Sequence, residues 1–369
     1  MTRINRLIIG EVLGPFLGGV GMFTTLFFAA DGLQRIADYL QRGESAAVIL
    51  QVVLYTLPTL LPYTIPMAML LGALLAFGRL SGDSEIVAML AAGVSFPRIV
   101  MPAVLLSAAI ALPIVWLNQK IVPELAFARQ AVIDNAKARG GGSAAGRNAF
   151  DVAVTNPSSG RMTVHAEGGV SFDDKGRGVL NGVTITLWDD TKPVVTVAAQ
   201  TATWKLGTRN WLLDGGVTSF DHNSLVGMRT ADTRLQEVTL GTPEDLRALS
   251  RPVIEQVTDQ LRKRAQVRRK LGQEMDAREA EVEIARRTAF PLATIVFVLL
   301  GAPLGLQPRR AGKSLGFGLS VLLTFGYWSL LQLGMSIGKG GALPPDLAVQ
   351  LPNIIGVITG IFLIKRVAS

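Results

Sequence analysis

The chain contains no recognisable grouping of catalytic residues. The two histidines, His165 and His222, lie far apart in a strand-like segment, and there is no cysteine to act as a nucleophile, metal ligand or disulfide partner. Gly312-Lys313-Ser314 resembles the end of a phosphate-binding loop, but position 307, where its first glycine must stand, is glutamine. The sequence therefore predicts no catalytic centre, no metal site and no cofactor.

Arginine clusters are the remaining candidates for chemistry. Arg35 follows the first apolar run, Arg286-Arg287 precedes the fourth, and six basic residues crowd 262–270. Because a guanidinium fork matches phosphate with paired hydrogen bonds, these positions could hold an anionic group. For 262–270 we favour a helix that touches anionic lipid head groups.

The composition places these arginines in a membrane protein. Of 369 residues, 49% are hydrophobic and 17% charged, where a soluble domain carries about 25% charge, and the mean hydropathy is +0.38. Each of six charge-free runs reaches or exceeds the ~18 residues needed to cross a bilayer core. They are Val12–Ala30, Ser45–Gly78, Ile99–Gln119, Thr288–Pro308, Ser314–Gly338 and Leu347–Ile364. We predict six transmembrane helices, the first retained rather than cleaved.

The distribution of basic residues predicts the orientation. Nine stand on the side that holds both termini, and three stand in the short loops of the other side. Cytoplasmic loops carry the excess of Lys and Arg, so both termini are expected in the cytoplasm. The formal net charge of +8 is thus mostly a topology signal, and nucleic-acid binding is not expected.

The polar segment between the third and fourth runs is expected outside, as a domain. We expect residues 1–120 to form the first three helices, 121–287 the outer domain and 288–369 the last three helices. Within the outer domain a helical connector leads to a jellyroll-like β domain over about 149–241, because Val, Thr and Trp alternate there between turn sequences. A helical return over 245–287 follows. The Gly-rich stretch 140–146 is expected to be a linker or loop.

The loop 79–98 contains a short helix over about 84–92. Asp83 or Ser84 could cap it, and Gly93 could end it. Ile86, Val87, Met89 and Leu90 are apolar in a loop too short to bury them. The helix could dock into a groove of a cytoplasmic partner, or it could lie on the lipid surface; the residues alone favour neither.

The first and fifth runs combine glycines with bulky aromatic residues. Gly10, Gly14 and Gly18 form a small-residue face on the first run, beside an aromatic end formed by Phe23, Phe27 and Phe28. The fifth run carries Gly316, Gly318, Gly326 and Gly334 together with Phe325, Tyr327 and Trp328. Such faces could pack within the bundle, or they could form a weakly packed pair of helices that can separate.

These features resemble the lipopolysaccharide-export permease family LptF/LptG along nearly the whole chain. The resemblance is carried by Leu57-Pro58 and Leu61-Pro62, by Ser84–Met89 with Ala92–Ser95, by Leu117-Asn118, and by Glu281–Arg287 running into Phe290-Pro291 and Gly301–Gly305. The Glu85–Gly93 and Arg287–Gly305 stretches are the most specific.

The resemblance implies a non-catalytic permease subunit in the bacterial inner membrane. Its partners would be a second, homologous permease subunit, a cytoplasmic ABC ATPase dimer that hydrolyses ATP, and periplasmic jellyroll bridge proteins. The substrate would be lipopolysaccharide or a related glycolipid. A family-like coupling helix would use Asp83, Glu85, Ile86, Met89 and Leu90.

The resemblance also assigns the lipid path. Arg35, Arg286 and Arg287 fall where the family binds lipid phosphates, and the lateral gate would use Phe23, Phe27, Phe28, Phe325 and Trp328. A lipoprotein-release type of permease is a poorer match, because it carries its outer domain between the first two helices. The alternative function is a membrane scaffold or sensor whose β domain binds a partner without ATP-driven transport.

Overall fold

The computed structural model describes most of the chain. The described residues are 3–41, 43–139, 150–156, 160–167, 171–172, 177–189, 192–215, 217–221, 228–230, 236–240, 242–243, 246, 253–270, 273–306 and 313–368. The Gly-rich stretch 140–146 and His222 lie outside them. The chain forms two compact units, 1–129 with 281–369, and 130–280. Each unit is described by itself.

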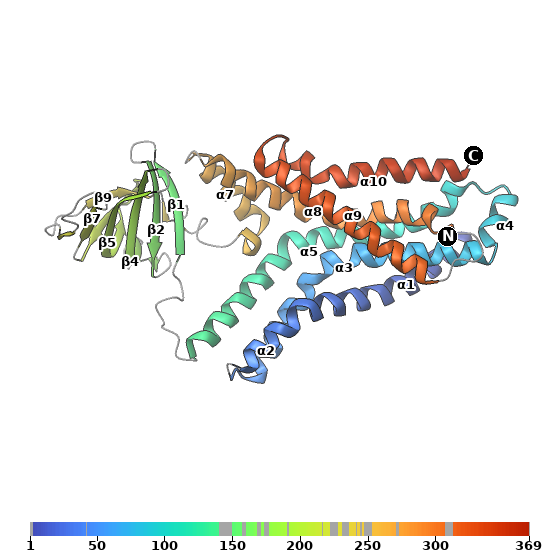
Figure 1. The fold of residues 1–369 in the computed structure, drawn as a ribbon, viewed down its shortest axis with the longest axis horizontal. Helices are drawn as coiled ribbons and strands as arrows, with labels where there is room; N and C mark the ends of the chain where they lie inside the picture. The colour runs from blue at the N-terminus through green and yellow to red at the C-terminus, as the bar shows by residue number, and fades with distance from the viewer. Residues whose placement is uncertain are drawn as a thin grey trace. The chain divides into compact units, whose positions relative to one another are not determined.

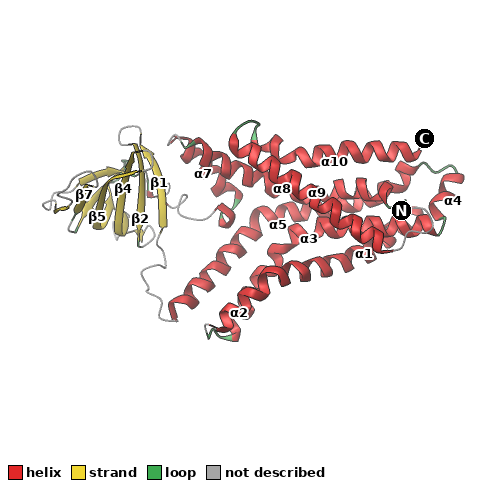
Figure 2. Ribbon diagram, in the orientation of Figure 1, coloured by secondary structure: helices red, strands yellow, loops and turns green. Residues whose placement is uncertain are grey.

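Long helices dominate the structure. They are α1 (Arg3–Phe27), α2 (Leu33–Gln41), α3 (Ala46–Gly82), α4 (Glu85–Ala91), α5 (Phe96–Arg139), α7 (Thr258–Lys270), α8 (Glu274–Leu304), α9 (Lys313–Gly340) and α10 (Pro345–Ala368), with a π turn η1 (Phe28–Gly32) and a 3-10 turn η3 (Val253–Glu255) (Figure 1). In the part of the chain that is described, six helices are long and apolar enough to cross a membrane. With the β-sheet inserted between the third and fourth of them, they confirm the predicted fold class (Figure 2).

The helical unit is built around α3. This helix contributes an almost continuous buried stretch, Thr64–Leu74, and packs against α1 and α9. The Thr24 hydroxyl of α1 donates to the Thr64 hydroxyl at 3.1 Å, so the two helices also share a hydrogen bond. Figure 1 places both chain termini and α4 at the same end of this unit. An even number of crossings requires both termini on one side.

Glycines decide where helices approach closely. A Cβ on Gly72 would lie 3.1 Å from the Val12 carbonyl oxygen of α1, and a Cβ on Gly334 of α9 would overlap the Ala348 carbonyl oxygen of α10. By contrast, a Cβ on Gly10, Gly14 or Gly18 would meet nothing within 4 Å. Small residues let backbones approach in lipid, and here only some of them are used for contacts inside the chain.

The β unit is one antiparallel sheet that branches. Its strands are β1 (Phe150–Asn156), β2 (Gly160–Ala166), β3 (Ser171–Phe172), β4 (Gly178–Asp189), β5 (Lys192–Trp204), β6 (Asn210–Asp214), β7 (Thr218–Asp221), β8 (Met228–Thr230) and β9 (Gln236–Thr239). The main order is β1-β2-β4-β5-β6-β9. β5 pairs along one edge with β4 and along the other with β6 and then β7. Trp211, Met162 and Val164 are among its buried residues.

The structure divides two segments of this region. The alternating run Trp211–Phe220 predicts one strand, but it forms two, because Gly215 takes a left-handed φ of +80° between β6 and β7. The helical return is also divided, since α7 ends at Lys270 and α8 begins at Glu274. The second division positions an arginine: Arg268 of α7 pairs with Asp276 of α8 at 3.0 Å and donates to Gln273.

The basic stretch 262–270 is therefore only partly a surface charge. Burial lowers the pKa of Arg268, while Asp276 and Glu279 oppose that shift. Arg262 and Arg269 are exposed, and each pairs with a nearby acid, Asp259 and Glu274. Arg268 thus serves the fold of this unit, whereas Arg262 and Arg269 remain at its surface.

Replacing Gly334 with alanine should destabilise the helical unit. Its Cβ would meet backbone rather than a side chain that can rotate away, so α9 and α10 must separate, at a cost of about 1–3 kcal/mol. Thermal unfolding of the purified protein in detergent measures this. The control is Gly326→Ala on the same helix, where a Cβ meets nothing within 4 Å. Equal melting temperatures for the two variants would contradict the packing described here.

Candidate functional site

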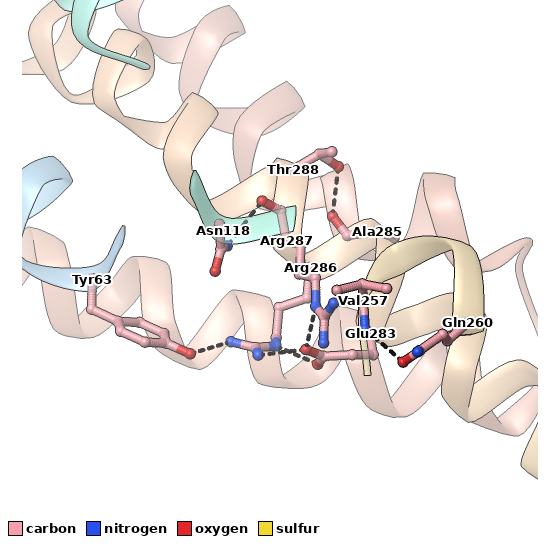
Figure 3. Close-up of polar contacts among 9 residues, drawn as sticks. All are labelled: Tyr63, Asn118, Val257, Gln260, Glu283, Ala285, Arg286, Arg287 and Thr288. Atoms are coloured by element: carbon pink, nitrogen blue, oxygen red, sulfur yellow. Dashed lines mark hydrogen bonds and ion pairs between the residues drawn. The ribbon is translucent and has the colours of Figure 1, made fainter. Parts of the chain in front are cut away.

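A buried ion cluster joins α8 to α3. Arg286 donates from Nε and Nη2 to the two carboxylate oxygens of Glu283, both at 2.8 Å, one turn earlier on α8. Its remaining Nη1 donates to the Tyr63 hydroxyl of α3 at 2.7 Å, and its charge lies 5.7 Å from the centre of the Tyr63 ring. Figure 3 shows the guanidinium held between the two partners. The two edges of Arg286 are thus occupied by residues of its own chain.

Arg287 shares the same carboxylate. Its Nε donates to Glu283 at 3.0 Å, and only 2% of its side chain is exposed. The Glu283 and Arg286 side chains are 12% and 13% exposed. The i, i+3 and i+4 spacing on one helix brings the three groups together, and a carboxylate that accepts three charge-assisted hydrogen bonds is held firmly. The structure therefore brings together the two predicted phosphate-binding arginines, already paired with an internal anion.

A backbone carbonyl beside these arginines accepts a hydrogen bond from another helix. Pro291 has no N–H, so the carbonyl of Arg287, four residues earlier, loses its helical donor. Asn118 of α5, a buried residue, donates from Nδ2 to that carbonyl at 3.0 Å (Figure 3). An unsatisfied carbonyl is costly in lipid, so the Asn118 amide replaces the missing bond and ties α5 to α8 at Arg287.

An aromatic layer continues from this cluster. Tyr63 lies 5.4 Å from Phe290 and 6.0 Å from Trp328 of α9 between ring centroids, and Phe290 lies 5.3 Å from Trp328. Behind it, the Tyr327 hydroxyl donates to Asn353 of α10 at 3.1 Å. Of the predicted gate residues, Trp328 is therefore packed beside the arginine cluster.

The other predicted gate residues differ in exposure. Phe23 is buried in the helical unit, Phe27 and Phe28 are half-buried, and Phe325 is 70% exposed. The Phe28 ring rests on Gly32, where a Cβ would lie 2.8 Å from it. The outward face of α9 thus carries Phe325, whereas the aromatic end of α1 mostly packs inside.

The short helix α4 presents two different faces. Ile86 is 2% exposed and joins the core of the helical unit, and Met89 packs against that core. Val87 is 61% exposed, Leu90 faces out as well, and Glu85 is half-buried. The helix ends as predicted at Gly93, with φ +82° and the bonds Val94 N–H to Met89 and Gly93 N–H to Leu90. Ser84 occupies the first cap position but makes no side-chain capping bond, so the predicted cap by its hydroxyl was wrong.

Two charged residues that precede α4 are paired within the chain. Asp83 lies 3.5 Å from Arg79, and Arg79 also contacts Glu11 of α1 at 2.9 Å. Glu11, the one acid near the interior of the first span, thus has a basic partner on α3. Arg35 lies on α2, and its side chain is outside the described part of the structure.

Of the two histidines, His165 lies in the described part of the structure. His165 is exposed on β2, as expected of a strand residue. Within the described residues no group of His, Asp and Glu could hold a metal ion.

Sequence reasoning missed Glu283 and Tyr63. The E-x-x-R-R spacing on a helix could have revealed Glu283, because positions three and four apart share a face. Tyr63 gives no such signal, since it is 223 positions away from Arg286. Pro291 indicates that the Arg287 carbonyl needs another donor, but Asn118 could be identified as that donor only if the packing of α5 against α8 were known.

The model of the family described as "Lipopolysaccharide export system permease LptF/LptG" matches residues 6–366, nearly the whole chain. The match confirms the resemblance that the sequence motifs indicated. Among curated proteins none matches the chain.

Pro291→Ala should make Asn118 dispensable. Asn118→Ala alone should cost about 1–3 kcal/mol, since it leaves a buried carbonyl unsatisfied. Pro291→Ala returns a backbone N–H to that carbonyl, so the cost of Asn118→Ala should shrink in that background. Unfolding of the four combinations in detergent measures the coupling. Pro303→Ala, on the same helix but a different turn, is the control and should give no rescue; additive effects with Pro291→Ala would count against the substitution of one bond by the other.

Proposed function

The chain belongs to the lipopolysaccharide export permease family LptF/LptG, and on that premise we propose that it is one of two permease subunits of an ATP-driven exporter. The exporter would extract lipopolysaccharide from the inner membrane and pass it to the β domain, which would hand it to a bridge of periplasmic jellyroll proteins. The observation that carries this proposal is the family match, which extends across both groups of spanning helices and the β domain.

The proposed orientation places both termini and α4 in the cytoplasm and the β domain in the periplasm. Two independent observations support it. The side with both termini holds nine of the twelve basic residues counted in the termini and short loops. In addition, the termini and α4 lie at one end of the helical unit (Figure 1).

The proposed contact with the ATPase dimer uses the outward face of α4. Val87 and Leu90 are exposed there, and Glu85 begins the helix beside them. Ile86 and Met89 of the predicted coupling set would act differently, because they anchor the helix to the permease core. Force from an ATPase could thus enter through one face of α4 and leave through the other.

The proposed lipid path runs beside the arginines and between subunits. Arg35, Arg286 and Arg287 would bind head-group phosphates, and the outward faces of α1 and of the partner's α9 would form the lateral gate. The uncovered glycines of α1 and the exposed Phe325 of α9 support this, since among the described residues a Cβ on these glycines would meet nothing within 4 Å and Phe325 is 70% exposed. Helices in lipid are held mainly by packing, so such a pair can part at modest cost.

Charge on the outward face of α4 should separate the permease from its ATPase. Val87→Glu and Glu85→Lys should each reduce co-purification of the ATPase by about tenfold or more, because an unpaired charge at a packed contact costs several kcal/mol. Leu206→Glu, at an exposed apolar site in the β unit, is the control and should have no effect.

The same experiment tests the alternatives. Unchanged co-purification and transport in Val87→Glu would indicate that α4 rests on the lipid surface. Lipid found by mass spectrometry on the wild-type complex, and released only with ATP, is expected of the exporter. A scaffold or sensor would show no dependence on ATP.

A reporter inserted at Gly207 should behave as periplasmic. Gly207 lies in the exposed turn between β5 and β6, with φ +76°, so an insertion should leave the sheet intact. Alkaline phosphatase should be active at this site and inactive when fused after Ser369. The reverse pattern would overturn the proposed orientation.

A further inference from the structure

The pairing of Arg286 resembles the pairing that a phosphate would make. Its Nε and Nη2 donate in parallel to the two oxygens of Glu283, both at 2.8 Å. Guanidinium binds phosphate oxygens through the same parallel fork. The Glu283 carboxylate therefore occupies the position on Arg286 that a head-group phosphate would take.

Glu283 also links the two arginines. One of its oxygens accepts from Arg286 Nη2 at 2.8 Å and from Arg287 Nε at 3.0 Å. The three side chains are on one helix, so they can exchange partners by rotating about side-chain bonds without moving α8. Neither arginine can present this edge to another anion while Glu283 holds it.

We propose that Glu283 is a positioning residue that serves as an internal counter-anion, which a lipid phosphate displaces on binding and which reclaims the arginines on release. This inference rests on the proposed function, in which Arg286 and Arg287 bind lipid phosphate. Glu283 raises the lipid concentration needed for binding, because the phosphate must compete with it. In return it speeds release, because the arginines regain a partner when the lipid leaves.

Tyr63 links the exchange of partners at Arg286 to helix α9. It accepts from Arg286 at 2.7 Å and stacks on Trp328 of α9. A change of partner at Arg286 therefore occurs in contact with the proposed gate helix.

The test compares Glu283→Gln with Glu281→Gln in the complete complex of permease subunits and ATPase. Glutamine keeps the shape of Glu283 and removes its charge. Glu281 is two residues earlier on α8, so Glu281→Gln removes the same charge from the same helix. The probes are purified lipopolysaccharide and the same lipopolysaccharide after phosphatase treatment. Binding is measured in detergent, and ATP-driven release is measured in proteoliposomes.

We expect Glu283→Gln to raise the affinity for lipopolysaccharide and to lower the rate of its release. In Glu283→Gln the half-saturating concentration of lipopolysaccharide should fall about tenfold. A tenfold change corresponds to roughly the free energy of one charge-assisted hydrogen bond. The release rate at saturation should fall as well. Phosphatase-treated lipid should show no gain in affinity, and Glu281→Gln should behave as the wild type does. Glu283→Asp, which keeps the charge on a shorter side chain, should lie between wild type and Glu283→Gln.

Other results would overturn the inference. Equal or weaker lipopolysaccharide binding in Glu283→Gln, with wild-type binding intact, would show that the carboxylate serves only the fold. If Glu283→Gln fails to assemble, Glu283→Asp decides, and unchanged affinity there has the same meaning. If the wild-type complex binds both lipids equally, the proposed binding of phosphate by Arg286 and Arg287 is itself wrong. That result differs from the results that contradict only the role of Glu283.

Discussion

The structure depends on one constraint: inside a bilayer, a backbone carbonyl that loses its helical donor must find another within the protein. Pro291 creates such a carbonyl at Arg287, and the Asn118 amide satisfies it at 3.0 Å. The bond fixes α5 against α8 at the turn that carries both arginines. The position of the proposed phosphate ligands thus follows from a backbone requirement, which no surface electrostatic argument would have revealed.

The glycines of the helical unit are of two kinds: some lie at contacts between helices of this chain, and others lie on helix faces that contact no neighbouring helix in the described residues. Gly72 and Gly334 stand where a Cβ would strike the backbone of a neighbouring helix, so they are needed for the fold of this chain. Gly14 and Gly326 have open space around them. Because small residues permit close approach in lipid, the open faces of α1 and α9 remain suited to another helix. The same residue type therefore has two roles that hydropathy cannot separate.

The sequence predicted those features that local patterns determine. Six spans follow from run length, the strands of the β domain from alternation, and the end of α4 from Gly93 in its left-handed conformation. The division of Trp211–Phe220 at Gly215 was missed because a glycine inside an alternating pattern does not by itself say whether the strand bends or stops. The contact between Arg286 and Tyr63 could not be predicted, since it depends on how α3 and α8 pack.

The aromatic layer connects the candidate site to the candidate gate. Phe290 follows the arginine turn of α8, touches Tyr63 of α3, and contacts both Tyr327 and Trp328 of α9. Close-packed rings cannot move independently, because an opened gap forfeits their dispersion contacts. If α9 shifts to open a gate, Trp328 must move against Tyr63, the residue that also holds Arg286. Phosphate capture and helix separation would then act on the same few side chains, so neither could change without affecting the other.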